Sequence, residues 1–120
     1  MKTLLLVGAG SFLGGMLRYG FSMMFPVKLG DFPWNTFLIN LIGCFAIGMV
    51  YGITSKLSTP NEYKLFLATG LLGGFTTFSA FSLESISMVR NGDIYYALMY
   101  VLGSIILGLG LTGLGLYVCR

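Results

Sequence analysis

Four long apolar runs, separated by short polar segments, constrain what this chain of 120 residues can fold into. The runs cover residues 3–25, 34–54, 64–89 and 94–118, and roughly 20 mostly apolar residues are enough to cross a bilayer. All three prolines lie between the runs, at positions 26, 33 and 60. We therefore expect an all-α membrane protein with four transmembrane helices, a single domain over residues 1–120, surrounded by lipid.

The charged and metal-binding side chains exclude several classes of protein. Charged residues make up 9% of the chain and there is no histidine, whereas soluble domains carry about 25% charged residues. The basic residues occur singly, without the clusters of nucleic-acid-binding modules, so we expect no nucleic-acid partner. With no histidine, and with Cys44 and Cys119 far apart in the sequence, we expect neither a zinc or iron site nor an enzyme.

The third run is interrupted by a stretch that disfavours a regular helix. Residues 70–81 read GLLGGFTTFSAF and combine three glycines, two threonines and a serine with three phenylalanines. Each glycine in a helix interior costs about 1 kcal/mol relative to alanine, and threonine offers the backbone competing hydrogen bonds. We expect the helix to break near Gly73 and Gly74. Irregular backbone at membrane depth is tolerated where protein buries it or where it lines a polar path, which predicts an ion or solute site.

Polar side chains inside the other runs favour the same interpretation. Thr36 and Asn40 are four residues apart and share a helix face, as do Tyr100 and Ser104. Arg18 lies in the outer third of the first run, where it either extends to the membrane surface or belongs to a functional site. These residues predict polar stripes along at least two helices.

The basic residues give only a weak preference for one orientation in the membrane. They divide almost evenly between the two sides: Lys2, Lys56, Lys64 and Arg120 on one, and Lys28, Arg90 and the nearby Arg18 on the other. Orientation normally follows an excess of such residues on the cytoplasmic side. We therefore expect dual topology, with copies inserted both ways and paired antiparallel.

In these motifs the whole chain resembles the Fluc (CrcB) family of fluoride channels. The resemblance rests on residues 14–19 (GGMLRY), on residues 34–43 (WNTFLINLIG) and above all on the GGFTTFS string at residues 73–79, followed by Phe81. It implies a passive, fluoride-selective exporter in the plasma membrane of a bacterium. It also implies an antiparallel homodimer with two pores and a structural sodium ion at its centre. A heterodimer of two paralogues remains the alternative.

The resemblance and the polar stripes together assign roles to particular residues. The fluoride pore is assigned to Thr36, Asn40, Phe78, Ser79, Phe81, Tyr100 and Ser104, the vestibule to Arg18, and the sodium-binding backbone carbonyls to Gly73 and Thr76. Phenylalanine rings have a positive edge that can face an anion, and amide and hydroxyl groups are conventional donors. Carbonyls freed by a broken membrane helix can ligate a hard cation.

Two departures from the family pattern remove hydroxyl groups. Ala80 stands where many members have threonine, and Gly108 stands where some relatives have a polar residue. Both changes weaken the predicted polar stripe.

The main rival is a small four-helix drug/proton antiporter, which needs a titratable carboxylate in the membrane. Glu84, near the end of the third run, is the only candidate for that role. A structural assembly subunit is a further rival, but it would not account for the broken, hydroxyl-rich third run.

Overall fold

The computed structural model describes all residues 1–120 and is helical apart from short connections, with a single isolated bridge between Leu29 and Asp31. Its elements are α1 (Lys2–Met24), α2 (Trp34–Lys56), α3 (Asn61–Lys64), the π-helix η1 (Leu65–Leu72), α4 (Gly73–Phe75), α5 (Phe78–Arg90) and α6 (Ile94–Cys119). The segment from α3 to α5 forms one interrupted helix, so four helical units are long and apolar enough to cross a membrane.

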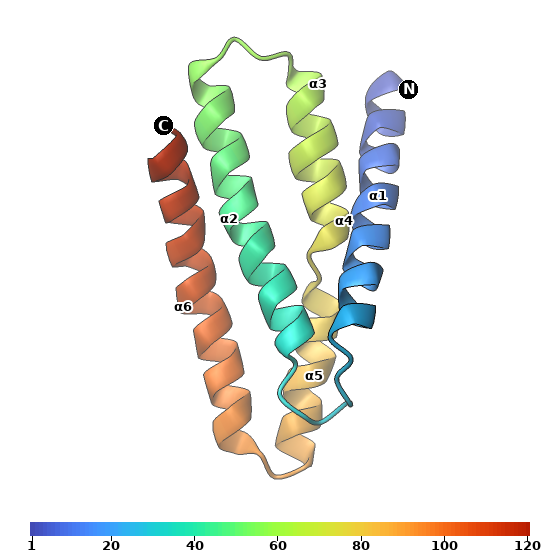
Figure 1. Cartoon of the computed structure of the whole chain (residues 1–120), viewed down its shortest axis with the longest axis vertical. Helices are drawn as coiled ribbons and strands as arrows, with labels where there is room; N and C mark the ends of the chain where they lie inside the picture. The colour runs from blue at the N-terminus through green and yellow to red at the C-terminus, as the bar shows by residue number, and fades with distance from the viewer.

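The helices pack as two close pairs that are joined at one end of the molecule (Figure 1). In the first pair α1 runs along η1 and α4, and in the second α2 runs along α6. Below the break α5 packs against α6 and so links the pairs. Both termini and the α2–α3 loop lie at the opposite end from the α5–α6 turn (Figure 1).

Small residues allow the two helices of each pair to touch through their backbones. A Cβ atom on Gly14 of α1 would collide with the carbonyl oxygen of Leu71, and one on Gly48 of α2 would collide with the carbonyl oxygen of Thr112 on α6. The Thr112 hydroxyl also donates a hydrogen bond of 3.0 Å to the Cys44 carbonyl oxygen. Close approach of this kind provides the packing that holds helices together in lipid, where there is little hydrophobic force between them.

The expected interruption of the third helix is confirmed, but it falls at Thr76 and Thr77, three residues beyond the expected Gly73 and Gly74. Both glycines are helical, in α4, whereas Thr76 (φ −81°, ψ 157°) and Thr77 (φ −148°, ψ 119°) are extended. Gly74 instead provides close packing, because a Cβ there would press on the backbone of Ser11.

The threonine hydroxyls stabilise the ends of the two half-helices. Thr76 Oγ1 donates to the Leu72 carbonyl oxygen at 3.0 Å, and Thr77 Oγ1 accepts from the Ala80 N–H at 3.3 Å as the N-cap of α5. Side-chain bonds of this type compete with the helical ladder and are favoured at caps. The break therefore follows the threonines and not the glycines.

The core is small and lies where α5 meets α6. It is formed by Met88, Ala97 and Tyr100, with Phe37 and Phe81 packed against it. Only 19 of the 120 residues are buried, and most large apolar side chains are exposed. A surface this apolar requires cover by lipid or by a second chain.

Candidate functional site at the helix break

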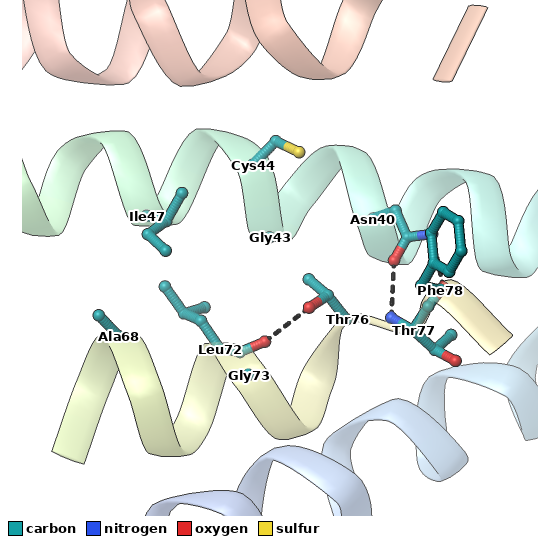
Figure 2. Close-up of a pocket in the computed structure, with 10 residues that line it drawn as sticks. All are labelled: Asn40, Gly43, Cys44, Ile47, Ala68, Leu72, Gly73, Thr76, Thr77 and Phe78. Carbon is teal, nitrogen blue, oxygen red and sulfur yellow. Dashed lines mark hydrogen bonds between the residues drawn. The ribbon is translucent and has the colours of Figure 1, made fainter. Parts of the chain in front are cut away.

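An open groove lies between α2 and the interrupted third helix, centred on the break. It encloses about 320 Å³, and Figure 2 shows its lining. The residues that carry chemistry there are Asn40 and Gly43 from α2 and Gly73, Thr76, Thr77 and Phe78 from the third helix. Gly43 brings the two helices together, because a Cβ at this position would collide with the Thr76 methyl group. The groove thus joins the two motifs that the sequence singled out.

The Asn40 side chain bonds the extended backbone of Thr77 twice. Its amide nitrogen donates to the Thr77 carbonyl oxygen at 3.1 Å, and its amide oxygen accepts from the Thr77 N–H at 2.9 Å. Figure 2 shows this side chain reaching from α2 across to the break. Asn40 is half-buried and keeps one amide N–H that these two bonds do not use.

An aromatic row leads from the groove into the core. The ring centroids of Phe78 and Phe81 are 5.6 Å apart, and those of Phe81 and Tyr100 are 5.0 Å apart. The Phe78 ring is 78% exposed and lines the groove, whereas Tyr100 is fully buried. The row therefore connects an open surface with a closed interior.

Glu84 lies beyond the aromatic row and binds two of the predicted pore residues. Thr36 Oγ1 donates to one carboxylate oxygen at 2.6 Å, and the Tyr100 hydroxyl donates to the other at 2.7 Å. The sequence interpretation considered Glu84 only as the carboxylate of a rival transporter and missed this cluster. Glu84 follows Phe81 by three residues, so both lie on one helix face. That spacing in the sequence could have placed Glu84 beside the predicted pore residues.

On α6 the predicted polar stripe continues from Tyr100 to Ser104 and is interrupted at Gly108. The Ser104 hydroxyl is buried and has no hydrogen-bond partner. One turn further, at Gly108, the space is filled by Cys44 from α2, whose Sγ lies 3.3 Å from where a Cβ on Gly108 would stand. The stripe thus has a free donor at Ser104 and the Cys44 thiol beside Gly108.

Ser79 and Ala80 lie at the first turn of α5. The Ser79 hydroxyl is 3.4 Å from that of Thr77 and is exposed. Ala80 contributes its backbone N–H to the Thr77 cap and is half-buried. Ala80 is therefore part of the first turn of α5 and does not line the groove.

Arg18 lies on the α1 side of the break and does not line the groove. Its Nε donates to the Gly74 carbonyl oxygen at 3.2 Å. Hydrogen bonds thus occupy the carbonyls of Leu72, Gly74 and Thr77 around the break. In contrast, the carbonyl oxygens of Gly73 and Thr76 accept no hydrogen bond from a side chain or from the backbone N–H of a loop residue.

Seven of the ten predicted residues thus fall into two neighbouring places, and three lie outside them. Asn40, Gly73, Thr76 and Phe78 line the groove; Thr36, Phe81 and Tyr100 gather around Glu84; Arg18, Ser79 and Ser104 stand apart, on α1, at the start of α5 and on α6.

Comparisons with known proteins match nearly the full length of the chain. The family model described as CrcB-like protein, Camphor Resistance (CrcB), matches residues 5–116. A relative from Thermus thermophilus is 43% identical over 116 residues, covering 96% of this chain and 93% of the relative. One from Chlorobium phaeobacteroides is 45% identical over 109 residues, covering 89% and 84%. A third, from Beijerinckia indica, is 43% identical and covers 100% and 98%.

All three relatives bear the name fluoride-specific ion channel FluC. The resemblance seen in the sequence is confirmed by these matches. Together with four membrane-length helices, they make this chain a multi-pass protein of the bacterial plasma membrane. The chain belongs to the CrcB-like family.

Proposed function

We propose that this protein is a passive, fluoride-selective ion channel that exports fluoride from the cytoplasm. The observation that carries the proposal is the buried Ser104 hydroxyl without a partner, on the helix that also carries Tyr100 of the aromatic row. A buried polar group without a hydrogen bond is costly and rare in proteins. A small anion that passes Ser104 would supply the missing acceptor. The relatives named as fluoride channels support the choice of anion.

Fluoride holds its hydration shell tightly, so a pore has to replace water with groups of partial positive charge. The edges of Phe78 and Phe81 supply such charge along the row. Asn40 retains one free amide N–H. The hydroxyls of Thr36 and Tyr100 are engaged with Glu84, so an anion that binds them has to compete with this carboxylate.

The partner in this proposal is a second copy of the chain, inserted the opposite way to form an antiparallel homodimer. Support comes from the open groove and the exposed Phe78 ring, because an exposed apolar patch beside polar groups is typical of a surface that another protein covers. The nearly even distribution of basic residues supports insertion in both orientations. A heterodimer with a paralogue is less favoured, since Asn40, Phe78 and Phe81 are all present in this chain.

A sodium ion fits the proposed centre of such a dimer. The carbonyl oxygens of Gly73 and Thr76 would hold it, since neither receives a hydrogen bond from a side chain or a loop. Carbonyl oxygens are ligands suited to a hard cation, and Gly73 is exposed at the groove. A bound cation supplies positive charge that lowers the cost of an anion in the membrane. Exchanging sodium for N-methylglucamine should stop fluoride flux; full flux after complete exchange would contradict this role.

Growth of a fluoride-sensitive bacterium that lacks its own exporter tests the proposal in cells. Expression of this protein should restore growth in medium containing fluoride, whereas the Phe81→Ile variant, expressed at the same level in the membrane, should not. Failure of the wild-type protein to protect, despite membrane insertion, would contradict an export function.

A further inference from the structure

The two extended residues of the break leave backbone groups that no helix can satisfy. An unpaired N–H or C=O at membrane depth costs several kcal/mol, so each requires a partner. Thr77 exposes both groups to the same neighbour, the Asn40 side chain on α2. The pair of bonds, 2.9 and 3.1 Å long, imitates the exchange that an adjacent β-strand would make.

A primary amide is the side-chain group best suited to this exchange. It carries an acceptor oxygen and a donor nitrogen side by side, whereas a carboxylate can only accept and an apolar side chain can do neither. The two bonds also hold α2 against the start of α5. Phe78, the first residue of α5, is also the first ring of the aromatic row.

The other side of the break is bonded to α1. Arg18 Nε donates to the Gly74 carbonyl oxygen, at the end of the first half-helix, where the helix dipole is negative and a cation is favoured. Arg18 and Asn40 therefore approach the break from different helices and bond different halves of it. Gly73 and Thr76 each precede one of these bonded residues in the chain, and their own carbonyl oxygens receive neither bond.

We propose that Asn40 is the positioning residue of the helix break: its amide clamps the Thr77 backbone to α2, and this clamp fixes the start of α5 and the orientation of Phe78. The clamp itself is independent of the ion that passes, whereas its effect on conduction rests on the proposed fluoride channel. Asn40 then acts through the backbone, in addition to any contact that its free amide N–H makes with an anion.

Backbone hydrogen exchange at Thr77, measured on the purified full-length protein, tests the clamp directly. Asn40→Ala should make the Thr77 amide exchange about ten-fold faster or more, because one hydrogen bond and its geometry are lost. Asn40→Asp should keep exchange at Thr77 closer to the wild-type rate, since a carboxylate still accepts from the N–H, yet it should abolish fluoride flux.

Asn35→Ala is the matched control, because Asn35 is also an asparagine of α2 and its side chain bonds only the Thr36 N–H at 2.8 Å. It should leave exchange at Thr77 unchanged. Wild-type exchange in Asn40→Ala, with flux lost, would overturn the clamp and leave Asn40 as an anion contact alone. If Asn40→Ala does not fold, Asn40→Leu replaces it, since leucine has a similar volume and can neither donate nor accept; wild-type exchange at Thr77 in that variant would overturn the clamp equally. Absence of fluoride flux in the wild type would reject the channel without changing the exchange result.

Discussion

At the scale of single residues, the polar groups of this protein are largely bonded to one another before any ion arrives. Glu84 holds the hydroxyls of Thr36 and Tyr100, and Asn40 holds Thr77. Polar networks of this type, in a setting of low dielectric, favour one arrangement when every member is satisfied. Ser104 is the exception, and that exception makes it the best candidate for a direct anion contact.

Phe81→Ile tests the aromatic edge at this scale. Isoleucine keeps most of the volume, so the core around Tyr100 should stay folded at a cost below about 1.5 kcal/mol. The ring edge is lost, and fluoride efflux should fall by about ten-fold or more, because Phe81 is the ring that joins Phe78 to Tyr100 in the aromatic row. Efflux from liposomes measures the change.

Phe12→Ile is the control for this substitution, because Phe12 lies on α1 with its ring 67% exposed and outside the aromatic row. Efflux through this variant should match the wild type. Equal rates for Phe81→Ile and wild type would remove the ring edge from the conduction path.

The sequence allowed most site residues to be proposed but not their bonding partners. Asn40 and Phe78 stand out because an amide and a conspicuous phenylalanine motif occur in apolar runs. The bonds of Asn40 to Thr77, and the placement of Cys44 against Gly108, depend on how α2 packs against two other helices. Pairings between distant segments of this kind are not encoded in local spacing.

At the scale of elements, glycine has two roles that the sequence does not distinguish. In η1 and α4 it permits contact with α1, and the backbone there remains helical. Glycine propensity placed the break at Gly73 and Gly74, whereas the capping hydroxyls of Thr76 and Thr77 placed it three residues later. Local propensity was overridden by packing between helices, which propensity scales do not contain.

Gly115→Ala tests the close contact between α2 and α6. A Cβ at this position would collide with the Phe45 carbonyl oxygen, and relief by backbone movement should lower the free energy of unfolding by about 1–3 kcal/mol. Gly113→Ala, on the same helix, is the control, because nothing within 4 Å would meet its Cβ. Denaturation in detergent measures both. Equal stability of the two variants would contradict backbone contact at Gly115.

At the scale of the whole molecule, apolar length predicted the number and type of helices well. The runs of about 20 apolar residues became four membrane-length helices because only helices satisfy the backbone in lipid without a barrel. The pairing of α1 with the third helix and of α2 with α6 was not predictable, since glycines that permit close approach occur in all four runs.

Dual topology belongs to this scale as well. A reporter fused after Arg120 should be detected on both sides of the membrane, because the basic residues favour neither orientation strongly. Adding three lysines after Arg120 should shift the reporter to the cytoplasmic side and, by removing one orientation, reduce assembly of the antiparallel dimer. A wild-type reporter found on one side only would contradict dual topology.

The most direct test of the whole account is anion efflux from liposomes that contain the purified protein, with fluoride compared with chloride and no proton gradient. The account predicts rapid efflux of fluoride and none of chloride. An absence of fluoride efflux, together with substrate uptake that requires a proton gradient and is abolished by Glu84→Gln, would contradict the channel and establish a proton-coupled transporter.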